Sequence, residues 1–413
     1  MLLQMSICPK IGLQNVSINS EKWAKLGTLN WTPYLFYYLF AVICSVSLFT
    51  SCSDDDDEKV VCPVGETTFT DKSGLQLTYS SAPMLGKMVQ FVPQGNKAVL
   101  TLSGAPLDLS GLQRDAMSAP SGLTTAGVVP GELTTTLNVD LKIEGDKVSF
   151  EGTDKKEGRV LTYKGEATPS GMKLDVNVTM PTMGLAGTSW NLASLDKEEP
   201  TAPLHIVWKE NHDEVEMEGI LKQMISMIPV ENSTIPQLLD GVLKKVTFLP
   251  DGNIQAEYKD NPTDEAFKTS PLNLAMYSMD GDNKIRVYLN VNQIMAVADT
   301  KSPRTSIEEA LPALKQIILP MLAEGVPVFY REKENGNVAF YLGYDVFQPL
   351  LAIAGELVKD EALKAALVEL VKENAGPLGG LAAAFVKQIL DKLPDIIAVT
   401  EDVQIGIDLI SAK

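Results

Sequence analysis

Side chains that commonly act as catalytic bases are few in this chain, which contains two histidines, His205 and His212. A Ser-His-Asp hydrolase would need one of them as its base. His205 lies in an apolar stretch that ends at Trp208, whereas His212 lies in the polar segment that follows. This placement predicts a strand histidine and a turn histidine that do not meet, so neither is expected to serve catalysis or to bind a metal. The motifs of α/β-hydrolases, zinc proteases, dithiol oxidoreductases and nucleotide-binding loops are absent from the sequence.

Carboxylates are plentiful, with 53 aspartates and glutamates. Two carboxylates about 5–10 Å apart can hydrolyse glycosidic bonds, and a carboxylate-dependent hydrolase of envelope or dietary polymers is therefore an alternative function. However, no acidic residue stands on an apolar strand pattern flanked by several aromatics. Segments 251–253 and 280–283 have the oxygen spacing of calcium loops but lack the glutamate that an EF-hand needs, so both are expected to be hairpin turns. No catalytic residue, metal ligand or cofactor is predicted.

Aromatic residues gather in one stretch and are the best candidates for a binding surface. In a barrel, alternate residues of a strand face the interior, where such side chains can line a pocket for an apolar ligand. The alternative is that they complete a core beneath helices. The residues are Phe329, Tyr330, Phe340, Tyr341, Tyr344 and Phe347.

Cys52 follows an uncharged, mostly apolar run of 17 residues, 34–50. That length is typical of a signal-peptide core and is at the short limit of a membrane span. Leu48-Phe49-Thr50-Ser51-Cys52 resembles the lipobox of bacterial lipoproteins. The resemblance implies that residues 1–51 are a lipoprotein signal peptide and that Cys52 carries a thioether-linked lipid, whose acyl chains would anchor the protein in a membrane. The alternative is an N-terminal membrane anchor with an incidental cysteine.

Acidic residues follow Cys52 directly, in the run Ser53, Asp54, Asp55, Asp56, Asp57 and Glu58. Basic residues lie upstream of the apolar run, so the acidic side is expected to be exported. The acidic run resembles the surface-export signal of Bacteroidota lipoproteins, which implies an outer-membrane protein exposed on the cell surface. The alternative is a solvated spacer, because blocks of like charge remain extended. Residues 52–66 are predicted to be a disordered tether.

The composition excludes some classes of partner. The formal net charge is −18, which disfavours nucleic acid and broad adhesion to anionic membranes, since both need clustered Lys and Arg. A hydrophobic content of 45% with 21% charged residues is typical of a globular protein. Cysteines 8 and 44 fall in the leader, so Cys62 has no disulfide partner if Cys52 is lipidated.

Residues 67–187 are predicted to be a first, barrel-like β domain. Apolar and polar residues alternate along 137–143 and 172–180, which is the pattern of half-buried antiparallel strands. Gly145-Asp146 predicts a hairpin turn. Residues 104–132, rich in Ser, Gly, Pro and Ala, read as a long loop, and such loops are often functional or mobile.

Residues 188–413 are predicted to be a second β domain with inserted helices at about 306–325 and 346–393. Hairpins are expected around 250–253 and 334–337, and a closing strand at 403–409. Three helices are expected at 346–358, 361–374 and 378–393, the last ended by Pro394. A weak repeat of one β unit links 83–104 with 203–219.

The leader, the acidic tether and the two β units together resemble a family of outer-membrane lipoproteins of gut Bacteroidota. The resemblance implies two tandem antiparallel meander barrels of the calycin, or lipocalin, type in a mainly β protein with α insertions. The sequence favours non-catalytic binding of an apolar or amphipathic ligand, a glycan or a surface partner. A further alternative is an adhesin or an accessory subunit of an outer-membrane complex. Nothing in the sequence decides the oligomeric state.

Overall fold

The computed structural model describes residues 61–106, 123–156, 158–181, 184–211, 216–227, 233–297, 321–374 and 379–412. The predicted signal peptide, Cys52, the acidic run 53–58, His212 and most of the predicted helix at 306–325 lie outside the described residues. Residues Lys59–Lys413 form one compact unit. Among the described helices, none is long and apolar enough to cross a membrane.

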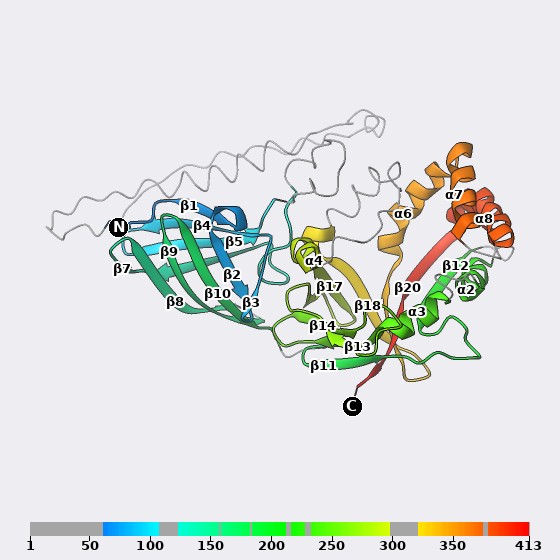
Figure 1. The fold of residues 1–413 in the computed structure, drawn as a ribbon, viewed down its shortest axis with the longest axis horizontal. Helices are drawn as coiled ribbons and strands as arrows, with labels where there is room; N and C mark the ends of the chain where they lie inside the picture. The colour runs from blue at the N-terminus through cyan, green and yellow to red at the C-terminus, as the bar shows by residue number, and fades with distance from the viewer. Residues whose placement is uncertain are drawn as a thin grey trace, which may run out of the picture. The chain divides into compact units, whose positions relative to one another are not determined.

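The first β region, residues 61–181, contains two sheets that share one core (Figure 1). Their strand orders are β1-β4-β5-β6 and β3-β2-β10-β9-β8-β7. The strands are β1 (Thr67–Thr70), β2 (Leu75–Tyr79), β3 (Ala82–Pro83), β4 (Lys87–Gln94), β5 (Lys97–Gly104), β6 (Thr134–Asp140), β7 (Lys142–Glu144), β8 (Lys147–Lys156), β9 (Arg159–Thr168) and β10 (Gly171–Thr179).

This region departs from the antiparallel meander that the sequence predicts. β10 pairs with β9 in an antiparallel hairpin, but on its other side it pairs in parallel with β2. The chain crosses to the other sheet between β3 and β4, so β10 meets a strand that is distant in sequence. The predicted alternation itself is confirmed, since inward-facing residues of β6 and β10 are buried and those between them are exposed or half-buried.

The second β region, residues 184–412, contains a closed eight-stranded antiparallel barrel. Its strands follow one another in chain order, and the last, β20, closes the barrel on β11. They are β11 (Thr188–Leu192), β13 (Leu243–Phe248), β14 (Asn253–Tyr258), β16 (Ala275–Met279), β17 (Lys284–Leu289), β18 (Val326–Glu332), β19 (Val338–Leu342) and β20 (Thr400–Ser411). β12 (Leu204–Glu210) also pairs with β20, and β15 (Lys268–Thr269) pairs with β14. The hairpins and the closing strand expected from the sequence are confirmed.

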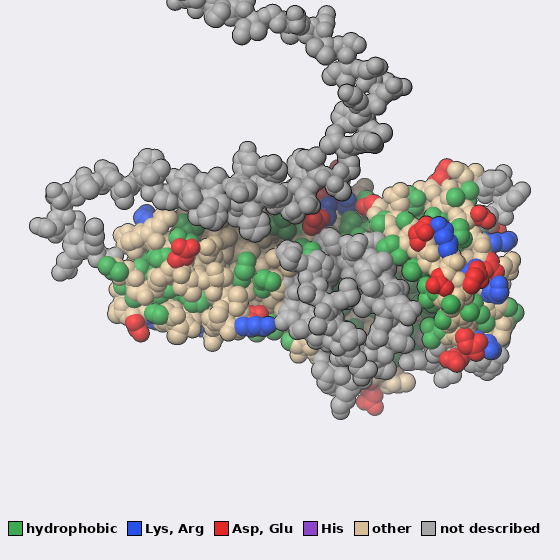
Figure 2. Space-filling view, turned by 90° about the horizontal axis from the view of Figure 1, so that it is seen from above, with side chains coloured by type: hydrophobic (Ala, Val, Ile, Leu, Met, Phe, Trp, Pro, Cys, Tyr) green, Lys and Arg blue, Asp and Glu red, His purple; other side chains and the backbone are tan. Residues whose placement is uncertain are grey.

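Helices pack on β12 and on the part of β20 that lies beside it (Figure 1). They are α2 (Met217–Met227), which contacts β12, α6 (Tyr344–Leu357), which contacts β20, and α8 (Gly379–Val399), and α7 (Glu361–Asn374) packs on α8. Two shorter helices are α3 (Ile235–Val242) and α4 (Val291–Val297). Buried Trp208, Met217, Ile396 and Val403 form the cluster between helices and strands. Figure 2 shows acidic and basic side chains intermixed over the α7 and α8 side, where pairs such as Lys364 with Asp391 neutralise one another.

The expected stop of the last helix at Pro394 is wrong, because α8 continues to Val399. Proline lacks the N–H that an interior helix position donates. Here Ile396 is buried beyond the proline, and the Thr400 hydroxyl donates to the Ile396 carbonyl at 2.8 Å. Tertiary packing and this hydrogen bond therefore stabilise a last turn that local sequence disfavours.

Hydrogen bonds from buried side chains join the two β regions. The Tyr79 hydroxyl donates to the Asp251 carbonyl at 2.5 Å, and Asn290 Nδ2 donates to the Leu85 carbonyl at 3.0 Å. Met276 and Tyr288 from the barrel belong to the same apolar cluster as the core of the first region. The barrel begins at Thr188, but the division of the chain into two domains stays a prediction.

Candidate functional site

The six aromatic candidates lie in three different environments. Tyr330 and Phe340 face the barrel interior, where their rings stack at 5.5 Å. Phe340 also lies 5.7 Å from Phe248, which in turn contacts Tyr277 at 5.1 Å. These distances are typical of packed aromatic pairs, so this part of the barrel interior is filled by side chains.

The remaining four candidates lie outside the barrel interior. Phe329 and Tyr341 are paired across β18 and β19 and stack at 5.8 Å. Lys284 Nζ lies 5.1 Å from the centre of the Phe329 ring, and the Arg331 guanidinium lies 5.5 Å from that of Tyr341. The other two, Tyr344 and Phe347, pack into the cluster beneath the helices. The structure therefore does not bring the six together in a single pocket.

His205 belongs to a buried polar cluster on β12 and β20. Its side chain is 5% exposed, and Nδ1 lies 3.8 Å from Oδ1 of Asp408, whose other oxygen accepts from Lys333 at 2.6 Å. Gln404 Nε2 donates to Asp402 at 2.7 Å, so Gln404 Oε1 faces His205 Nε2 at 3.2 Å and accepts its proton. Since this assigns the proton of neutral His205 to Nε2, Nδ1 presents a lone pair to Asp408.

The buried position of His205 makes stability depend on pH. Burial lowers the pKa of His205, and Lys333 and Arg331 add to this, against the opposing effects of Gln404 and Asp408. The unfolded state then takes up the proton first as pH falls through about 6.5, so this histidine contributes a loss of stability between pH 7 and pH 5.

We expect His205→Gln to reduce the loss of stability between pH 7 and pH 5 relative to the wild type, measured by urea unfolding at both values. Glutamine has no group that titrates in this range. An equal loss of stability in variant and wild type would show that the pKa of His205 is the same in the folded and the unfolded state.

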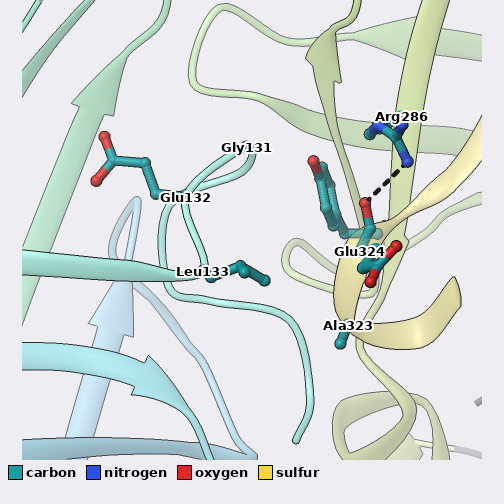
Figure 3. Close-up of a pocket in the computed structure, with 7 residues that line it drawn as sticks. Gly131, Glu132, Leu133, Arg286, Ala323 and Glu324 are labelled. Atoms are coloured by element: carbon teal, nitrogen blue, oxygen red, sulfur yellow. Dashed lines mark hydrogen bonds between the residues drawn. The ribbon is translucent and has the colours of Figure 1, made fainter. Parts of the chain in front are cut away.

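A pocket of about 290 Å³ lies between the two β regions (Figure 3). The first region supplies the loop before β6, and the barrel supplies β17 and the helical residues just before β18. Figure 3 shows Leu133 pointing across the pocket toward Ala323 and Glu324, whereas Glu132 points away from them. The lining residues are Gly131, Glu132, Leu133, Arg286, Tyr288, Ala323 and Glu324. Apolar and charged groups thus share one small concave site.

The wall from the first region is held by a segment that enters the core. Residues 125–130 are buried, and Val128 and Val129 belong to the apolar cluster of the first region. Lys87 Nζ donates to the Ala126 carbonyl at 2.7 Å, and the Thr125 hydroxyl donates to the Gly86 carbonyl at 2.6 Å. The pocket residues at 131–133 follow directly, so their positions are set by core packing.

Glu132 is a poor candidate for a general acid. Arg159 donates to its two carboxylate oxygens at 2.5 and 3.1 Å, and Thr135 and Lys156 donate at 2.7 and 3.1 Å. Although burial alone would raise the pKa of Glu132, these hydrogen bonds hold it below its usual value. A general acid needs a raised pKa and a free proton donor. Glu132 is therefore not suited to the acid role that the hydrolase alternative needs in its carboxylate pair.

Only one wall of this pocket could be predicted from the sequence. The composition of residues 104–132 predicts a long loop, and this segment supplies two of the pocket residues, Gly131 and Glu132. Arg286, Tyr288 and Glu324 belong to the barrel and carry no local motif. Their approach to the loop depends on contacts between segments about 150 to 190 residues apart, which periodicity does not report.

Comparisons with known proteins give no assignment, because no family model, no curated protein and no solved structure matches the chain.

Proposed function

We propose that the protein is a lipid-anchored, non-catalytic binding protein of the outer membrane that takes a small amphipathic ligand into the pocket between its two β regions. The observation that carries the proposal is the lining of this pocket, where the apolar Leu133, Ala323 and Tyr288 lie beside charged Arg286 and Glu324. A volume of about 290 Å³ is close to the lower end of ordinary small-molecule sites, which range from roughly 300 to 1,000 Å³.

Further features support the proposal. Leu133 is 61% exposed although it is a large apolar side chain in a concave site, where a ligand would shield it from water. The lipobox-like sequence at Cys52 and the acidic run after it favour attachment to the outer membrane and exposure on the cell surface. The closed meander order of the barrel favours the calycin-like family that the sequence resembles.

The ligand is tested by native mass spectrometry of protein purified from its host. We expect a non-covalent adduct on the wild type that Leu133→Trp abolishes, because the indole fills the pocket. Leu381→Trp is the matched control, since Leu381 is 64% exposed on α8 and should leave the adduct in place. An adduct that survives Leu133→Trp, or no adduct on the wild type, would contradict the proposal.

The anchor is tested separately with Cys52→Ala. The wild type should incorporate labelled palmitate and sediment with membranes, and the variant should not incorporate the label. Labelling that persists in the variant would exclude Cys52 as the lipidated residue. Protease treatment of whole cells then tests surface exposure, and complete protection would contradict it.

A further inference from the structure

We infer that the ligand of this pocket is a zwitterion of the amino-acid or short-peptide class, with an ammonium group, a carboxylate and an apolar side chain. This inference rests on the proposed function and deepens it. It follows from the charged side chains of the pocket that ion pairs within the protein do not neutralise.

The first region contributes no net charge to the pocket. Arg159 and Lys156 contact Glu132, and Arg159 also lies 2.9 Å from Asp154. Two positive and two negative charges therefore balance within this cluster. The Glu132 carboxylate is saturated by the donors around it and points away from the barrel side of the pocket (Figure 3). It is not available to a ligand.

The barrel side retains one positive charge. Arg286 Nε and Lys284 Nζ share the single carboxylate of Asp280, at 3.0 and 3.4 Å. Arg286 Nη1 donates to the carbonyls of Glu324 and Gly325 at 3.5 Å each, which is the long limit of a hydrogen bond. Two cations against one carboxylate leave a net charge of +1, and the guanidinium keeps donors for a carboxylate from outside.

The same side retains one negative charge. Glu324 is exposed, and in the described part of the chain its carboxylate has no salt bridge, since its contact with Arg286 is through the backbone carbonyl. Among the described residues, the pocket is thus lined by a carboxylate with no ion pair, which suits the ammonium of a zwitterion, and by a guanidinium with spare donors, which suits its carboxylate. Leu133, Ala323 and the Tyr288 ring then supply the apolar contact for its side chain.

The experiment measures binding of three probes by calorimetry: the dipeptide leucyl-leucine, its N-acetyl form and its C-terminal amide. We expect the free dipeptide to bind best and each capped form to bind about tenfold more weakly, because each loses a charge-assisted hydrogen bond. Glu324→Gln should bind the free and the N-acetyl dipeptide equally. Glu401→Gln is the matched control, since Glu401 is an exposed acid on β20 that does not line the pocket, and it should keep the discrimination.

Equal binding of all three probes by the wild type, or unchanged discrimination in Glu324→Gln, would overturn the inference. These results are distinct from a failure of the proposed function. If the host-derived adduct is lost in Leu133→Trp but no dipeptide binds, the pocket binds a ligand of another class. If neither an adduct nor a probe binds, the proposed function itself fails.

Discussion

Wild-type protein should gain about 2 kcal/mol of unfolding free energy between pH 7.5 and pH 10 from a single residue, and Lys87→Met should abolish this gain. Lys87 is 2% exposed, and burial lowers its pKa from 10.5 to about 8, with Asp71 opposing the shift in part. Between these two values the unfolded chain still holds the proton that the folded protein has released. Stability therefore rises with pH in this range and is lowest where both states are protonated.

Urea unfolding at pH 7.5 and pH 10 gives the difference for each protein. Lys97→Met is the matched control, because the Lys97 side chain on β5 is 67% exposed and its replacement should leave the rise in place. The methionine at position 87 leaves the Ala126 carbonyl without its donor, so the baseline stability of that variant also changes. The slope with pH, not the baseline, is the readout. A rise in Lys87→Met equal to that of the wild type would refute the assignment.

Lys87 also helps to position one wall of the pocket. Its amine donates to the segment that enters the core at 125–130, and the pocket residues at 131–133 continue from that segment. A neutral amine at high pH keeps the hydrogen bond and removes the cost of a buried charge. The segment that holds the wall of the pocket should therefore be more stable when Lys87 has lost its proton.

Local patterns were sufficient for most of the second β region. Alternation and turn residues predicted the hairpins β13–β14 and β18–β19, the closing strand β20 and the helices α6 and α7, and the structure confirms them. These elements are specified by neighbours in sequence, so period and turn chemistry suffice. The parallel pair β2–β10 was not predictable in this way, because its two strands lie about a hundred residues apart.

The hydrogen-bond partners of buried polar residues could not be predicted from the sequence either. Lys87 occupies the same face of β4 as Val89 and Phe91, so the alternation does place it toward the core, but nothing local supplies its acceptor, Ala126. Asn273 lies between Leu272 and Leu274, and no motif in the sequence singles it out. Its importance comes from the turn between β2 and β3, which contacts it from nearly 200 positions away.

Asn273→Ala should lower the unfolding free energy by about 3 kcal/mol or more. Asn273 is fully buried, and its Nδ2 lies 3.0–3.1 Å from the carbonyls of Tyr79, Ala82 and Pro83. Its φ of +64° is in the left-handed region, which asparagine tolerates better than alanine. Alanine thus removes the donor to these carbonyls, of which that of Tyr79 is buried, and adds backbone strain.

Two further variants, measured by urea unfolding, separate the effect of the missing hydrogen-bond donor from that of the backbone strain. Asn273→Gly relieves the strain but not the missing donor, so it should be about 1 kcal/mol more stable than Asn273→Ala. Asn273→Asp keeps the shape but directs a carboxylate at the same carbonyls, and should be the least stable of the three. If Asn273→Ala is as stable as the wild type, these hydrogen bonds contribute no net stability.

The same variants test whether the contact between the β regions supports the pocket, whose walls come from both. Ile285→Ala is the control, because Ile285 is buried in the barrel core and its truncation should cost a similar 2–5 kcal/mol without touching the first region. At equal loss of stability, and under conditions where both proteins remain folded, Asn273→Ala should retain less of the bound adduct than Ile285→Ala. Equal retention would mean that the pocket keeps its shape without Asn273, and that the remaining contacts, such as Tyr79 to Asp251, suffice to hold it.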